Sequence, residues 1–185
     1  MNILAASAAF LILSGPAVQL PSPKPTKEHN ALKAEAGVWE GKVKMFLGPG
    51  APVIEGESLE TVTTVCNGLH STASFKMEIG TTKFEGHSVI GYNPRKKEYT
   101  GTWVDTSTVT PTLLTGKYDA DKKIMTMLST VVDAASGQEM KQKQVTTLVD
   151  ENTKKFEIFF VTPQGDVKIL EINAKKRKEQ KKAGK

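Results

Sequence analysis

Residues 91–105 read GYNPRKKEYTGTWVD, which is the pattern of two strand-like segments joined by a polar turn. Asn93-Pro94 supplies the turn, since both residue types favour chain reversal. Successive strand residues point to opposite faces of a sheet, so Tyr99, Trp103 and Asp105 are predicted to share one face. The stretch therefore predicts an antiparallel hairpin that carries aromatic residues and a carboxylate on one side.

The same pattern continues through most of the chain. Segments rich in Val, Ile, Thr, Phe and Tyr alternate with turn-forming segments such as GPGAP, NG, DADKK and PQGD. The predicted strands are 38–47, 56–66, 69–78, 84–93, 98–106, 112–119, 123–132, 139–150, 155–162 and 166–174. About ten short strands with hairpin-length connections predict an all-β antiparallel meander, which closes into a barrel because closure removes exposed strand edges. Such an interior is either filled or holds one small ligand.

One short helix is predicted before the strands. The segment 26–37 reads TKEHNALKAEAG, with Thr26 as the N-cap and Gly37 as the C-terminal stop. The helix has weak apolar spacing, at Ala31, Leu32 and Ala34. From residue 38 onward the pattern has the period of strands and does not change back.

The junction between this helix and the first strand has a recognisable pattern. Gly37-Val38-Trp39, within LKAEAGVWEG (32–41), resembles the Gly-x-Trp opening of lipocalins and other calycins. The resemblance implies a lipocalin-like barrel in which the helix closes the base and Trp39 plugs it, so Gly37 and Trp39 are structural residues. It also implies that a basic side chain near the end of the last strand covers the indole. The candidates are Lys175, Lys176 and Arg177.

A longer pattern is more specific. The segments EHNALKAEAGVWEGKVKMFLGPGAP, FEGHSVIGYNPRKKEYTGTWVDTST, GKYDADKK and GDVKILEI follow one another in this order. Together they resemble the bacterial family called domain of unknown function 1579, over residues 25–176. The resemblance implies a lipocalin-like barrel in an exported protein, and it implies no activity. Family members commonly end with Tyr and Arg in the last strand, where this chain reads NAKKRK.

The chain is predicted to have four parts. Residues 1–19 form a signal peptide, because ILAASAAFLIL (3–13) has the length of the apolar core of an export signal. An N-terminal membrane anchor is the alternative, since no Lys or Arg precedes this run. Residues 20–25 form a proline-rich linker, 26–174 the barrel domain and 175–185 a basic tail. These features predict an exported protein, either periplasmic or secreted.

The positive charge is concentrated in the tail. Residues 175–185 contain seven of the 25 basic residues and one of the 20 acidic residues, so the other 174 residues carry 18 basic and 19 acidic groups. A neutral body offers no basic surface for specific nucleic-acid binding, and no aromatic residues alternate with the tail lysines. Membrane contact is therefore predicted only through the tail or an uncleaved leader.

The sequence contains no complete catalytic or metal-binding motif. Cys66 is the only cysteine, which excludes an intramolecular disulfide and a cysteine-based zinc cluster. The three histidines lack metal-ligand spacing, although His70 or His87 could ligate haem iron in a barrel of the nitrobindin type. GHSVIG (86–91) misses the Gly-x-Ser-x-Gly nucleophile pattern by one residue. No catalytic residue, metal or cofactor is therefore assigned.

Three functions stay open at this point. The leading hypothesis is a barrel that binds a small apolar or amphipathic ligand, with pocket residues Trp103, Tyr99, Tyr92 and Asp105. The second is a non-catalytic envelope protein that makes contacts through the barrel surface or the basic tail. The third, a hydrolase or isomerase, would use Glu85, Asp105 or His87. The sequence leaves undecided the identity of the ligand, the oligomeric state and whether the barrel is filled.

Overall fold

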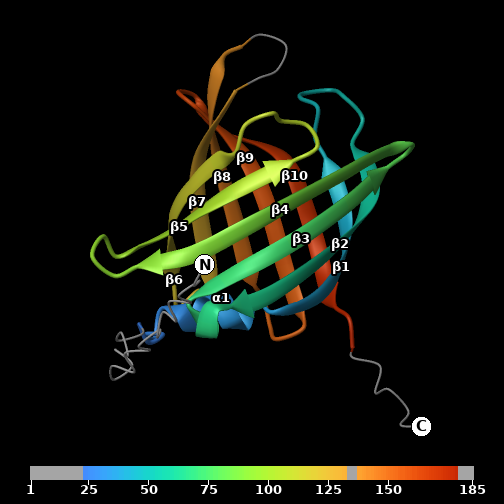
Figure 1. Cartoon of the computed structure of the whole chain (residues 1–185). Helices are drawn as coiled ribbons and strands as arrows, with labels where there is room; N and C mark the ends of the chain where they lie inside the picture. The colour runs from blue at the N-terminus through green and yellow to red at the C-terminus, as the bar shows by residue number, and fades with distance from the viewer. Residues whose placement is uncertain (1–22, 133–136, 179–185) are drawn as a thin grey trace, which may run out of the picture.

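The computed structural model describes residues 23–132 and 137–178, so the predicted signal peptide (1–19) lies outside the described residues. Within them the chain forms ten antiparallel strands, one short α-helix and one 3-10 turn (Figure 1). The strands are β1 (Gly37–Met45), β2 (Ile54–Val65), β3 (His70–Ile79), β4 (Thr82–Asn93), β5 (Glu98–Asp105), β6 (Thr112–Asp119), β7 (Ile124–Val132), β8 (Glu139–Leu148), β9 (Thr153–Thr162) and β10 (Gly165–Lys176). The helix α1 (His29–Ala34) precedes them, and the turn η1 (Cys66–Gly68) joins β2 to β3. The predicted all-β meander with one N-terminal helix is confirmed.

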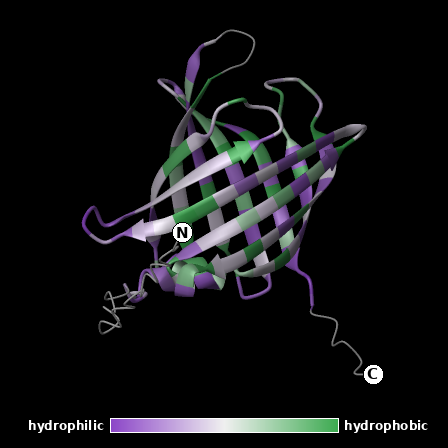
Figure 2. Cartoon of the chain, in the orientation of Figure 1, coloured by the Kyte–Doolittle hydropathy of each residue, from purple (hydrophilic) through white to green (hydrophobic). Residues whose placement is uncertain are grey.

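The sheet closes on itself. Each strand pairs with the next along the chain, and β10 returns to pair with β1, from Trp39 opposite Lys176 to Met45 opposite Leu170. Hydrophilic and hydrophobic residues alternate along many strands in Figure 2, as expected where one face lines an interior and the other meets water. β10 continues past the predicted domain end at residue 174. Its last two residues therefore belong to the barrel and not to the tail.

The two ends of the barrel differ. α1 lies at one end together with the β4–β5, β6–β7 and β8–β9 turns, and we call this the helix end (Figure 1). The longer β1–β2 and β5–β6 connections lie at the opposite end, which we call the loop end. α1 buries Ala31 and Leu32 against Tyr99, Leu114 and Met125 of the barrel. Burying these apolar side chains fixes the helix across one end of the barrel.

The helix is shorter than predicted. It begins at His29 rather than at residue 26, and Glu28 occupies the N-cap position. Thr26 does not cap the helix, because its hydroxyl donates a hydrogen bond of 2.6 Å to the Glu28 carboxylate instead of accepting one from a helix N–H. Gly37 is not the helix stop, since it is the first residue of β1. No helix in the described part of the chain is long and apolar enough to cross a membrane.

Charged side chains form a network on the outer face of β9 and β10. Lys155 lies 2.9 Å from Glu157 and 3.3 Å from Glu171, and Lys168 contacts the same two carboxylates. Asn173 donates a further hydrogen bond of 3.0 Å to Glu171. The hydrogen bond from Lys168, with smaller contributions from Asn173 and Lys155, lowers the pKa of Glu171 to about 2.

Glu171→Gln is expected to lower the free energy of unfolding by about 1–2 kcal/mol at neutral pH, after allowance for solvent screening of a surface network. The Glu171 pKa is about 2 in the folded chain against a reference value of 4.5, so this stability is present above about pH 4.5 and is lost as the pH falls towards 2. Urea denaturation at about pH 7 and about pH 2.5 measures the difference. Glu55→Gln is the control, because Glu55 is 73% exposed and 3.9 Å from Lys44. Equal losses in the two variants would contradict the role of the network.

Candidate ligand-binding cavity

The interior of the barrel is hollow. A cavity of about 580 Å³ extends from α1 towards the loop end, which is within the usual size range of small-molecule pockets. Inward-facing residues of all ten strands line it, and its apolar lining includes Met45, Val62, Ala73, Leu114, Met127 and Leu170. Of the two arrangements that the sequence left open, the structure has the one with space for a ligand.

Three aromatic side chains form one wall of this cavity. Phe84 on β4 stacks on Trp103 on β5, with ring centroids 6.4 Å apart and an interplanar angle of 15°. Phe75 on β3 lies 6.1 Å from Phe84 and 6.3 Å from Trp103. Gly86 makes room for the indole, because a Cβ there would lie only 2.2 Å from Trp103 Cζ2. We call Phe75, Phe84 and Trp103 the aromatic wall. It offers apolar contact area for a ligand.

Asp105 holds the aromatic wall in place. Trp103 Nε1 donates a hydrogen bond of 2.7 Å to Asp105 Oδ2. The other oxygen accepts hydrogen bonds from the backbone N–H groups of Ser107 (2.7 Å) and Thr108 (3.0 Å) and from the Ser107 hydroxyl (2.6 Å). Burial opposes ionisation, but these hydrogen bonds outweigh it and lower the pKa of Asp105. The ionised carboxylate therefore positions Trp103 and the turn that follows β5.

Tyr92 and Tyr99 lie nearer the helix end and do not line the cavity. They are opposite each other in β4 and β5, with ring centroids 5.0 Å apart. The Tyr99 hydroxyl donates a hydrogen bond of 2.7 Å to the Glu28 carbonyl, and burial raises the pKa of Tyr99 to about 12. Tyr92 packs edge-on against His29 at 5.9 Å. Both tyrosines fasten the helix segment to the barrel, which corrects the expectation that they belong to the pocket.

Trp39 lies at the floor of the cavity. Its Nε1 donates a hydrogen bond of 2.8 Å to the Glu35 carbonyl, which ties β1 to the end of α1. Lys154 Nζ and Lys176 Nζ lie 4.7 and 5.0 Å from the centroid of the Trp39 ring, within cation–π range. Gly37, with a φ of +142°, permits this approach, because an added Cβ would lie 2.2 Å from Lys176 Cε. Lys176 is thus the covering cation that the lipocalin resemblance implied, and Lys154 is a second one.

Charged groups stand on the same floor. Lys154 is only 4% exposed and forms an ion pair with Glu60, and both residues line the cavity together with Glu35. Within the described residues the Glu35 carboxylate has no hydrogen-bond or ion-pair partner. Burial raises the pKa of Glu35, and the nearby Lys154 offsets this effect only in part. We call Glu35, Glu60 and Lys154 the floor cluster.

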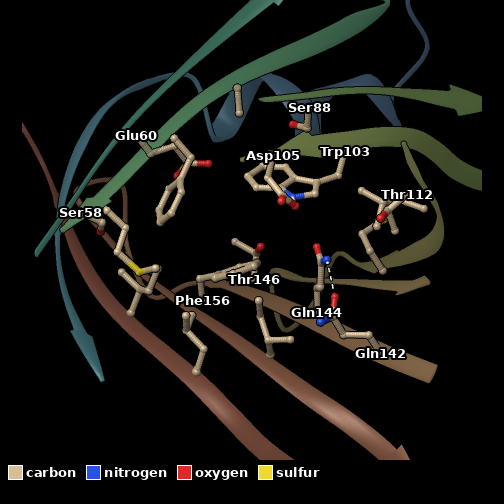
Figure 3. Close-up of a pocket in the computed structure, with 18 of the residues that line it drawn as sticks. Ser58, Glu60, Ser88, Trp103, Asp105, Thr112, Gln142, Gln144, Thr146 and Phe156 are labelled. Carbon is tan, nitrogen blue, oxygen red and sulfur yellow. Dashed lines mark hydrogen bonds between the residues drawn. The ribbon is translucent and has the colours of Figure 1, made fainter. Parts of the chain in front are cut away.

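Polar side chains of β8 lie across the cavity from Trp103 (Figure 3). Gln144 Nε2 donates a hydrogen bond of 3.1 Å to Gln142 Oε1. Thr112 and Thr146 lie to either side of this pair and also line the cavity. A primary amide has two donor hydrogens and an acceptor oxygen, so the pair keeps hydrogen-bonding capacity for a ligand.

The structure does not bring together the catalytic groups considered from the sequence. Asp105 is the partner of Gly86 and faces inward, so the neighbouring Glu85 faces outward. Glu85 instead lies 3.1 Å from His87 on the outer surface. Of the three residues considered for an enzyme inside the barrel, Asp105 lines the cavity, whereas Glu85 and His87 do not. Neither His70 nor His87 lines the cavity, so the haem-ligand idea has no support from their positions.

The floor cluster was not among the site residues expected from the sequence. Two of its members could have been identified from the sequence pattern, because a charged residue on an apolar inner face is unusual. Lys154 shares the strand alternation of Phe156 and Ile158, and Glu60 lies within β2 on the face that lines the cavity. Glu35 could not have been identified in this way, because it follows the helix and belongs to no strand.

Comparisons with known proteins agree with this architecture. The crystal structure of Rv2717c from M. tuberculosis has a TM-score of 0.60 at 10% identity, over 83% of this chain and 99% of that chain. The S-type phycobiliprotein lyase CPES from Guillardia theta has a TM-score of 0.56 at 11% identity, over 84% of this chain and 100% of that chain. At such identity the likeness shows the fold alone. No curated protein matches the sequence significantly. The family model described as Protein of unknown function (DUF1579) matches residues 24–176, so the chain belongs to this family.

Proposed function

We propose that the chain binds one small molecule with a largely apolar body inside the barrel. The observation that carries this proposal is the cavity of about 580 Å³, which α1 closes at one end and which the aromatic wall and other apolar side chains line. A cavity of this size and character removes most of a small ligand from water. The buried apolar area supplies affinity, and the few polar groups orient the ligand.

Ser88→Trp is expected to weaken ligand binding at least about tenfold, because a large side chain at this position occupies the ligand's space. Ser88 lines the cavity and is the cross-strand partner of Trp103. Titration with N-phenyl-1-naphthylamine, a neutral apolar dye whose fluorescence rises when it leaves water, measures the affinity.

The matched control for this blocking variant is Val89→Trp. Val89 is the next residue on β4 and is 48% exposed on the outer face, so an indole there leaves the cavity unchanged. Val89→Trp should bind the dye as the wild type does. The proposal fails if the wild type does not bind the dye, or if Ser88→Trp binds it with wild-type affinity.

We also propose that the protein is exported, on the basis of the apolar segment 3–13 and the small residues that follow it. Mass spectrometry of the chain expressed with its own leader tests this proposal. Loss of residues 1–17 or 1–19 would support export, and an intact N-terminus would favour the membrane anchor.

The alternative function, a non-catalytic envelope protein, would use another part of the molecule. β10 ends at Lys176 opposite Trp39, and residues 179–185 of the predicted basic tail lie outside the described residues. Nothing in the described part of the chain favours this function over ligand binding.

A further inference from the structure

The charges on the cavity floor are unbalanced. Lys154 is engaged twice, in the ion pair with Glu60 and over the face of Trp39. The Glu35 carboxylate lines the same space and has no hydrogen-bond or ion-pair partner among the described side chains. The floor cluster thus has two carboxylates for one ammonium group.

This imbalance discriminates between ligand head groups. An anionic head would meet two carboxylates, and Lys154, the ammonium group that lines the cavity in the described part of the chain, is already paired. Repulsion between like charges is stronger there than in water, because the surroundings are less polar. A neutral head would leave Glu35 without a charge partner. A cationic head would pair with Glu35 and balance the floor cluster.

We propose that the ligand is an amphiphile with an apolar body and a protonated amine head, and that the head binds at Glu35. This inference rests on the proposed ligand-binding function and specifies the class of ligand. The body lies along Phe156 and the aromatic wall, towards the loop end. Figure 3 shows Glu60 of the floor cluster reaching into the same space that Phe156 and Trp103 face, so head and body sites are continuous.

The proposal has a pH signature. Burial raises the pKa of Glu35, and the titratable groups that face it from other elements are Lys154 on β9, Glu60 on β2 and Tyr118 on β6. A bound amine stabilises the ionised form of Glu35. Amine affinity should therefore rise as the pH increases through the Glu35 pKa of the free protein, and below that pKa amine binding should release a proton. The affinity for an uncharged ligand should not follow this profile.

The experiment compares three probes that share one alkyl chain: dodecylammonium, dodecanol and dodecanoate, each kept below its micelle-forming concentration. Displacement of N-phenyl-1-naphthylamine gives the affinities. The wild type should bind dodecylammonium at least about tenfold more tightly than dodecanoate. Glu35→Gln should reduce this ratio to about threefold or less, because it weakens the affinity for dodecylammonium.

The matched control is Glu85→Gln, because Glu85 lies on the outer face, 3.7 Å from Lys76 and 3.1 Å from His87. It should keep the wild-type order of affinities. Equal binding of the amine and the carboxylate by the wild type, or an unchanged ratio in Glu35→Gln, would overturn the amine assignment while dodecanol binding upheld the proposed function. Failure of every probe to bind would overturn the proposed function itself.

A second measurement needs no variant. The wild-type affinities for dodecylammonium and dodecanol are measured between about pH 4 and pH 9, where the amine stays protonated. The inference predicts that the amine affinity rises with pH while the alcohol affinity stays constant. Parallel profiles for the two probes would overturn it, even if Glu35→Gln did not fold.

Discussion

Trp39→Ala is expected to lower the free energy of unfolding by about 3–5 kcal/mol, which is the usual cost of removing a fully buried tryptophan. Trp39 is 1% exposed and packs in the cluster that contains Val43 and Ile172. The substitution also removes the hydrogen bond to the Glu35 carbonyl and takes the aromatic face away from Lys154. Guanidinium denaturation followed by circular dichroism measures the loss.

Trp103→Ala is the matched control, because the chain has two tryptophans and Trp103 lines the cavity instead of closing it. This variant should lose less stability than Trp39→Ala, since its indole is only partly buried. It should weaken binding of the dye, because the aromatic wall loses its largest member. A loss of less than about 1 kcal/mol in Trp39→Ala would mean that α1 closes the barrel without help from Trp39.

Which residues of one strand share a face could be predicted from the sequence, because this depends on alternation alone. Trp103 and Asp105 were expected on one face, and both line the cavity. The positions of the ten strands were predictable for a similar reason, since turn-forming residues mark each reversal of the chain. Closure of the meander into a barrel followed from the need to protect its edges.

The position of a residue along the barrel axis, between the helix end and the loop end, could not be predicted from alternation. Tyr99 and Trp103 share a face, yet Tyr99 packs against α1 while Trp103 lines the cavity. This position depends on the register between strands and on where the helix packs, and both depend on residues far apart in the chain. Lys154 and Glu60 illustrate the same limit, because 94 positions separate them in sequence and they meet only after the barrel closes.

Lys154→Met is expected to lower the free energy of unfolding by about 3–5 kcal/mol at neutral pH, because it removes one partner of a buried ion pair and leaves the other uncompensated. Glu60 would lose its partner, and Glu35 would lose the positive charge nearest to it. Methionine keeps much of the length and apolar character of the lysine side chain. The loss should shrink at about pH 4, because burial raises the pKa of Glu35 and this carboxyl is then protonated. Urea denaturation at the two pH values measures it.

Two further variants separate the ion pair from the contact with Trp39. Lys154→Met combined with Glu60→Gln should recover at least about half of the loss, because no carboxylate of the pair is then left buried and charged. Lys176 is the other cation near the Trp39 ring, and it forms no ion pair among the described residues. Lys176→Met should therefore lower the free energy of unfolding by about 1 kcal/mol or less. If Lys154→Met and Lys176→Met lower the free energy of unfolding equally, Lys154 stabilises the barrel only through its contact with the Trp39 ring. In that case its pairing with Glu60 adds nothing to the stability of the barrel.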